Sequence, residues 1–173
     1  MDRDAVSTVL ALDLSTHSGW AFGGPEDKPK HGVWELGRDG NHGRYFSCLA
    51  EMLEGTIDVM KPDLVVFEAP LPHASEKFRT SSAASVRVLI GLCAVTEMIC
   101  FEKSVQCEEA SVRDARQLVM GAQPKDGKAG VIQFCNVLGW KPADDNAADA
   151  LILWQYRHLL DVANQRTKKL RRG

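Results

Sequence analysis

Four acidic residues occupy positions that suit the binding of a divalent metal ion. Asp13 follows the apolar residues 8–12, Glu68 follows the apolar residues 64–67, and Asp145 and Asp149 lie four residues apart near the C-terminus. Carboxylate oxygens are the protein ligands that Mg²⁺ and Mn²⁺ prefer. Two such ions can activate a water molecule and stabilise the leaving oxygen of a phosphodiester. The pattern therefore predicts a Mg²⁺ site, in which Mn²⁺ substitutes, that supports phosphodiester hydrolysis.

Each acid also has a simpler explanation when it is taken alone. Asp13 precedes a Ser- and Gly-containing segment and suits a turn, and Glu68 precedes Ala-Pro and suits the surface end of a strand. Asp144 and Asp145 suit the cap at the start of a helix, where the backbone dipole favours negative charge. The three acidic positions in this order favour the metal site over these separate explanations.

The first half of the chain predicts the elements that would carry Asp13 and Glu68. Residues 8–12, 20–22 and 32–34 are short β-prone runs, with a turn at residues 24–29 between the last two, so we expect a meander. Apolar residues then recur at helical spacing over residues 45–57, before Pro62. Residues 64–67 are continuously apolar, as in a strand buried on both faces. If the first and fourth strands are parallel neighbours, Asp13 and Glu68 meet at one edge of the sheet.

The second half predicts one more strand and several helices. Residues 81–101 form a long helix that is apolar nearly all round, which predicts burial by the core, by a partner subunit, or by both. Residues 105–107 suit a strand, and Ser111 suits the N-cap of a helix over residues 112–120. A short helix ending at Gly139 and a final helix over residues 143–164 follow. Asp145 and Asp149 share one face of that final helix.

Three stretches of the sequence resemble the RuvC-type Holliday-junction resolvases of the RNase H-like superfamily. The segment Leu10-Ala11-Leu12-Asp13-Leu14-Ser15 with Gly19-Trp20-Ala21 is similar to their first motif, and Val65-Val66-Phe67-Glu68 to their second. The segment 145–151, Asp-Asn-Ala-Ala-Asp-Ala-Leu, is similar to their last motif, and the likeness covers residues 8 to 160. The resemblance implies an α/β protein with the RNase H-like fold, a mixed five-stranded sheet flanked by helices; a phage-type member is one candidate.

The resemblance also implies a function and a set of site residues. It implies a Mg²⁺-dependent endonuclease that cuts four-way DNA junctions, works as a homodimer, and has these catalytic and metal-binding residues: Asp13, Glu68, Asp145, Asp149. The family places its late acids three residues apart, and that position is Asn146 here, so we predict Asp145 in its place. The DNA-binding residues that we predict are Arg116, Lys125, Lys128 and Phe78. The lysines also suit a solvated loop, and Phe78 also suits packing against the long helix.

Three other functions are alternatives to this one. A related nuclease would act on flaps, forks or RNA–DNA hybrids, and a catalytically silent protein would only bind branched DNA. An actin-like ATPase also opens with an Asp after a strand, but it needs a second glycine-rich segment and a longer chain, and the sequence shows neither.

Length and composition predict one domain, residues 1–164, which the resemblance implies is a nuclease domain, followed by a basic tail, residues 165–173. The chain has 173 residues, of which 45% are hydrophobic, and a net charge of −2 that argues mildly against a nucleic-acid binder. The tail carries five basic residues and no acid, which favours phosphate contacts or a solvated end. We expect no membrane span, reduced cysteines and a cytoplasmic protein.

Overall fold

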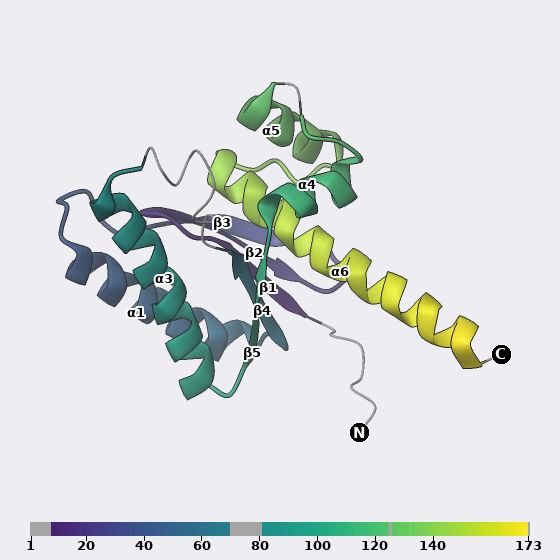
Figure 1. Cartoon of the computed structure of the whole chain (residues 1–173), viewed down its shortest axis with the longest axis horizontal. Coiled ribbons are helices and arrows are strands. Elements are labelled where there is room, and N and C mark those ends of the chain that lie inside the picture. Colours follow the sequence, from purple (N-terminus) through teal and green to yellow (C-terminus); the bar gives the residue numbers. More distant parts are fainter. Residues whose placement is uncertain (1–7, 70–80, 125, 173) are drawn as a thin grey trace.

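A five-stranded mixed sheet with the strand order β3-β2-β1-β4-β5 lies at the centre of the computed structural model (Figure 1). The structure describes residues 8–69, 81–124 and 126–172. The first three strands form an antiparallel meander, and β4 and β5 run parallel to β1. The strands are β1 (Val9–Asp13), β2 (His17–Gly23), β3 (Lys30–Glu35), β4 (Leu64–Glu68) and β5 (Gln106–Ala110). This arrangement confirms the predicted RNase H-like class, including the parallel pairing of the first and fourth strands.

The central strand β1 is buried on both faces because helices cover both sides of the sheet (Figure 1). Leu10 and Leu12 point into the core on the side of α1 (His42–Met60) and α3 (Ala83–Glu102). Val9 and Ala11 alternate with them and point into a second core beneath α6 (Asp145–Arg172). A strand of this kind needs apolar residues at every position, which explains the unbroken apolar run before Asp13.

The helix ends follow local sequence signals. Asn41 caps α1 by accepting a hydrogen bond from the backbone N–H of Arg44, and Lys61 ends the helix in the left-handed conformation, directly before Pro62. Ser111 caps α4 (Val112–Met120) by accepting from the backbone N–H of Asp114, as predicted.

Several predicted boundaries are wrong. The second and third strands, predicted at residues 20–22 and 32–34, extend over His17–Gly23 and Lys30–Glu35. The last strand begins and ends later than residues 105–107, because its parallel ladder with β4 continues as far as the pair Glu68–Ala110. The helix α6 continues to Arg172 instead of ending at residue 164, since no Gly or Pro interrupts residues 165–172. Figure 1 shows its C-terminal part projecting beyond the sheet. The division into a domain and a basic tail stays a prediction.

The long helix α3 is buried on one face, not all round. Val88, Leu92 and Cys93 lie in the core that α3 shares with α1, whereas Ile90, Met98 and Phe101 are 47%, 48% and 86% exposed. By length and composition α3 is also long enough to cross a membrane, contrary to the expectation that no stretch reaches this length. This is weak evidence for a span, because core helices of soluble proteins meet the same criterion.

The five cysteines are free thiols, as expected. Cys93, Cys100 and Cys135 are buried, and Cys48 and Cys107 are partly buried.

Candidate active site

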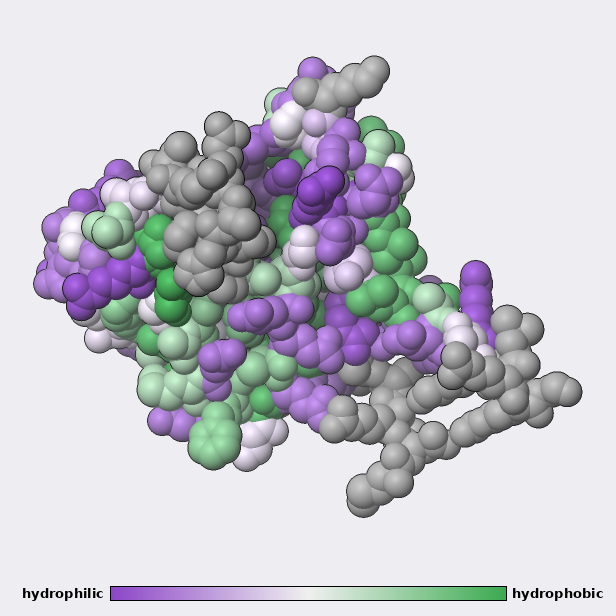
Figure 2. Space-filling model, viewed as in Figure 1, coloured by the Kyte–Doolittle hydropathy of each residue, from purple (hydrophilic) through white to green (hydrophobic). Residues whose placement is uncertain are grey.

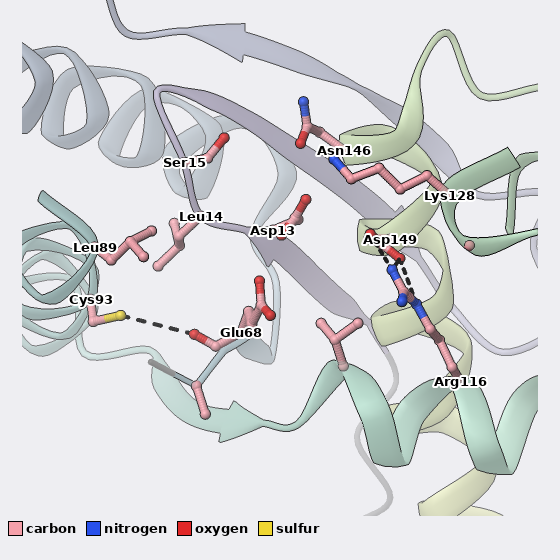
Figure 3. Close-up of a pocket in the computed structure, with 13 residues that line it drawn as sticks. Asp13, Leu14, Ser15, Glu68, Leu89, Cys93, Arg116, Lys128, Asn146 and Asp149 are labelled. Carbon is pink, nitrogen blue, oxygen red and sulfur yellow. Dashed lines mark hydrogen bonds and ion pairs between the residues drawn. The ribbon is translucent and has the colours of Figure 1, made fainter. Parts of the chain in front are cut away.

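Asp13 and Glu68 converge at the carboxyl edge of the sheet, as the predicted parallel pairing requires. They end β1 and β4, whose register pairs the preceding residues Leu12 and Phe67. Figure 3 shows both side chains extending into the same pocket, where the hydrogen bond and the charge of Glu68 both raise the pKa of Asp13. The topology of the sheet thus places two carboxyl groups in contact.

Asp13 is a buried acid in an unfavourable place for negative charge. Its relative exposure is only 8%. Burial, the hydrogen bond and charge of Glu68, and the charge of Asp149 together raise the pKa of Asp13 to about 9. A divalent cation between these oxygens would relieve the repulsion, so the donor set suits a hard metal ion.

The helix α6 reaches this edge because a glycine on β2 leaves room for its first turn. Gly19 lies directly opposite Asp13 in the β1–β2 pair. A Cβ atom added to Gly19 would lie 2.0 Å from the backbone carbonyl oxygen of Asn146 and 2.8 Å from the backbone nitrogen of Ala147. This packing role of Gly19 was not predicted, although a glycine inside a strand is the signal that indicates such a close approach.

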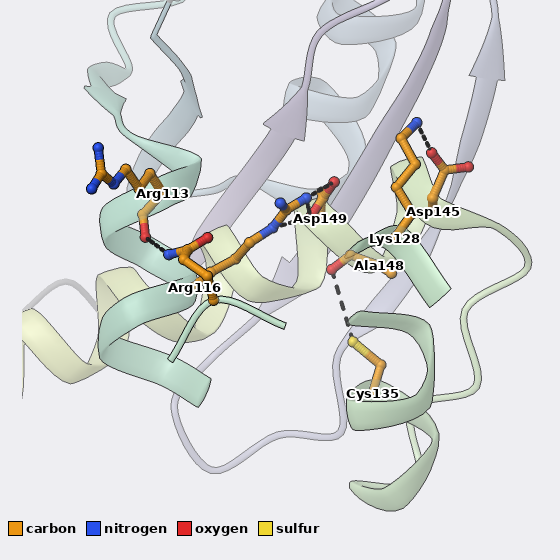
Figure 4. A network of polar contacts seen from close by, with 8 residues as sticks. Arg113, Arg116, Lys128, Cys135, Asp145, Ala148 and Asp149 are labelled. Atoms are coloured by element: carbon orange, nitrogen blue, oxygen red, sulfur yellow. Dashed lines mark hydrogen bonds and ion pairs between the residues drawn. The ribbon is translucent and has the colours of Figure 1, made fainter. Parts of the chain in front are cut away.

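Asp149 is buried on the sheet side of α6 and is bound by Arg116 of α4 (Figure 4). Nη2 of Arg116 donates to both carboxylate oxygens of Asp149 at 2.7 Å, and Nε donates to Oδ1 at 3.1 Å. Burial raises the pKa of Asp149, and the hydrogen bond and charge of Arg116 act in the opposite direction. The predicted DNA-binding residue Arg116 therefore also neutralises one of the predicted metal ligands.

Asp145 forms an ion pair with Lys128, which lies near the start of α5 (Gly127–Val137). This ion pair is far more exposed than the one between Arg116 and Asp149. The hydrogen bond from Lys128 lowers the pKa of Asp145, and the same bond raises the pKa of Lys128. Asp144 accepts a hydrogen bond from the backbone N–H of Ala147 at 2.9 Å and is the helix cap that the sequence predicted. Asn146 lines the pocket described below, whereas Asp145 does not.

A pocket of about 370 Å³ opens over the two strand ends (Figure 3). Its lining includes the residues Asp13, Ser15, Glu68, Cys93, Arg116, Lys128, Asn146 and Asp149. Among the described residues, no three His, Cys, Asp or Glu side chains are arranged to hold a metal ion together. Asp149 is turned toward Arg116, and Asp145 toward Lys128. The predicted DNA-binding residues Lys125 and Phe78 lie outside the described residues.

The mixed sheet, with acids on β1, β4 and α6 at one edge, has the RNase H-like fold, and three solved structures share it. The chain is similar to the structure of Thermus thermophilus RuvC, with a TM-score of 0.63, 18% identity, and coverage of 92% of this chain and 97% of that one. It is similar to T. thermophilus RuvC in complex with a Holliday junction substrate, with a TM-score of 0.68, 14% identity, and coverage of 92% and 96%. It is also similar to Ydc2, the yeast mitochondrial Holliday junction resolvase, with a TM-score of 0.62, 10% identity, and coverage of 94% and 82%.

Comparison of the sequence with family models and curated proteins does not detect this likeness. No family model matches the sequence, and no curated protein is similar enough in sequence to match. At 10–18% identity, the three structures show the fold and leave the activity to be argued from the site.

Proposed function

We propose that this protein is a divalent-metal-dependent endonuclease that cuts four-way DNA junctions. The observation that carries the proposal is the meeting of the Asp13 and Glu68 carboxyl groups at the ends of β1 and β4, with Asp149 of α6 and Lys128 in the same pocket. The proposal draws further support from the likeness to resolvase structures, one of them solved with a Holliday junction.

In this proposal the acids hold the metal and the basic residues hold the DNA. Asp13, Glu68 and Asp149 would bind Mg²⁺, or Mn²⁺ in its place, with Asp145 as the fourth acid. When bound, the metal supplies Lewis-acid stabilisation and a lower pKa for the attacking water. Arg116 and Lys128 line the same pocket and would contact backbone phosphates, which position a nucleic acid without reading its sequence. Lys125 and Phe78 stay predicted DNA contacts.

We further propose that the protein acts as a homodimer, because a four-way junction needs two cuts related by a two-fold axis. The exposed apolar face of α3, formed by Ile90, Met98 and Phe101, is the surface that we assign to the second subunit. Figure 2 shows hydrophobic residues gathered over the lower part of α3. The cytoplasmic location, without membrane attachment, stays a prediction.

A second candidate is a protein that binds branched DNA without cutting it. It is favoured by the two ion pairs, because Arg116 and Lys128 already neutralise two of the four acids that a nuclease would use.

A substrate panel separates these functions. The purified protein is incubated in Mg²⁺ or in EDTA with a four-way junction, a flap, a fork, an RNA–DNA hybrid and a linear duplex. We expect paired cuts in the junction that need Mg²⁺ and much slower cutting of the other substrates. Faster cutting of a flap, fork or hybrid would assign a related nuclease instead. Tight junction binding with no cutting in Mg²⁺ or Mn²⁺ would assign the silent binding protein.

A further inference from the structure

The ion pair between Arg116 and Asp149 uses three of the roughly four lone-pair directions of this carboxylate. Both of its oxygens accept hydrogen bonds from the guanidinium group, at 2.7 Å, 2.7 Å and 3.1 Å (Figure 4). A metal ion needs the lone pairs of the same oxygens. Arg116 and a metal therefore compete for Asp149.

Burial makes this competition strong. The side chains of Arg116 and Asp149 are 20% and 10% exposed, so water and salt screen their attraction only weakly. The pair of Lys128 and Asp145 is different, because the Lys128 side chain is 71% exposed and such surface pairs contribute little. The competition with a metal ion is therefore concentrated at Arg116.

A DNA phosphate offers Arg116 an equivalent partner. The planar guanidinium fork binds a phosphate through two parallel hydrogen bonds, as it binds a carboxylate. Arg116 lines the same pocket as Asp13 and Glu68, so a backbone phosphate brought to these acids comes within the range of its side chain. When Arg116 turns to the phosphate, both oxygens of Asp149 become available.

We propose that Arg116 is a built-in competitor of the metal ion, and that a DNA phosphate releases it from Asp149. The free protein then binds metal weakly, and DNA and metal strengthen each other's binding by the same factor, as thermodynamic linkage requires. This exchange makes metal loading depend on the presence of DNA. The DNA-dependent half of the proposal rests on the proposed function, whereas the competition in the free protein does not.

The competition is tested first without DNA. Ca²⁺ serves as the probe, since it is an oxygen-binding dication like Mg²⁺. Its affinity is measured by isothermal titration calorimetry for the wild type, Arg116→Gln and Arg113→Gln. Arg113 is an exposed residue of the same helix and does not line the pocket, so its replacement removes one positive charge at a site outside the pocket. We expect Arg116→Gln to bind Ca²⁺ about tenfold more tightly, equal to about 1.4 kcal/mol, and Arg113→Gln to match the wild type. Unchanged or weaker binding by Arg116→Gln would overturn the proposal.

A second variant covers the case in which Arg116→Gln does not fold. Arg116→Lys keeps the positive charge but cannot bind both carboxylate oxygens as a planar fork. We expect Arg116→Lys to bind Ca²⁺ more tightly than the wild type does, by a smaller factor than Arg116→Gln. Circular dichroism and thermal unfolding report whether each variant is folded.

The same titrations are then repeated with a four-way junction in slight excess, with gels to show that the DNA stays intact. We expect the junction to tighten Ca²⁺ binding by the wild type about tenfold and to change it little in Arg116→Gln. Equal tightening in both proteins would contradict release of Arg116 by a phosphate. A wild type that does not bind the junction would instead refute the proposed function, and the DNA-free comparison would still decide whether Arg116 competes with metal.

Discussion

Gly19 touches the backbone of Asn146 so closely that a methyl group added to it would lie 2.0 Å from the carbonyl oxygen. Because Asn146 lies in the first turn of α6, this contact fixes how near Asp149 comes to the strand ends. We expect Gly19→Ala to push α6 outward, lower the free energy of unfolding by about 1–3 kcal/mol, and reduce cleavage. Urea denaturation and cleavage rates measure the two effects.

Gly55→Ala is the matched control for that substitution. Gly55 lies within α1, and a Cβ atom there meets nothing within 4 Å. The alanine should stabilise the helix slightly, by about 0.5–1 kcal/mol. If Gly19→Ala were as harmless as Gly55→Ala, the close approach of α6 would not hold the site together.

The strand ends show what could be predicted from the sequence. Asp13 and Glu68 follow unbroken apolar runs, and such runs indicate buried strands whose ends share an edge, so their meeting was predictable. The partners of Asp149 and Asp145 were not, because they depend on how α4 and α5 pack against α6. No periodicity in the sequence indicates that Arg116 reaches Asp149, 33 residues away.

Which side of α3 faces the core was not predictable, for a related reason. Hydrophobicity shows that a helix avoids water but not which neighbour covers it. In the structure, Val88 and Leu92 face the core whereas Ile90, Met98 and Phe101 face outward. A charge at Val88 or Leu92 would thus test the core and not a subunit contact.

The stability of the metal-free protein should depend on pH through Asp13. Its pKa rises from an ordinary 3.8 to about 9 in the folded protein, so the folded state holds more protons than the unfolded chain between these values. The free energy of unfolding therefore falls as the pH rises through this window. We expect the free energy of unfolding of Asp13→Asn to fall less with rising pH than that of the wild type. At pH 8 the variant should therefore unfold at a higher temperature than the wild type, whereas at pH 4 it should not. Thermal unfolding in EDTA at a series of pH values tests this, and parallel pH curves for the two proteins would contradict it.

The roles of Asp145 and Asn146 can be separated by three variants. We expect Asp145→Asn to lose most cleavage activity and Asn146→Ala to stay nearly unchanged, because only Asp145 brings negative charge to the site. Lys128→Gln removes the ion pair but leaves the carboxylate. Because Lys128 is also a proposed phosphate contact, its rate is compared at a junction concentration that saturates each variant. Single-turnover rates across a range of Mg²⁺ concentrations provide the comparison. If Asn146→Ala were inactive and Asp145→Asn active, Asn146 and not Asp145 would be the active-site residue at this position.

The α3 surface should hold the dimer together. Phe101 is 86% exposed, so Phe101→Glu places a charge in the proposed interface without disturbing the core. We expect a monomeric mass for this variant and a dimeric mass for the wild type, by light scattering at micromolar concentration. Val137→Glu is the control, because Val137 is 81% exposed at the end of α5, a helix that packs against the other core of the molecule from α3. A monomeric wild type would remove the homodimer and the paired cuts with it.

The most direct test of the central claim is the single-turnover rate at which Asp13→Asn cuts a four-way junction in saturating Mg²⁺, measured beside its affinity for the same junction. Asp13 contributes charge to the metal site and lies deeper than the basic residues proposed to hold the DNA, so its loss should act on the chemistry. We predict a rate at least roughly 100-fold below that of the wild type, which corresponds to about 2.7 kcal/mol of lost transition-state stabilisation, with junction affinity nearly unchanged. An Asp13→Asn variant that cuts at the rate of the wild type would contradict a metal-dependent active site at the ends of β1 and β4.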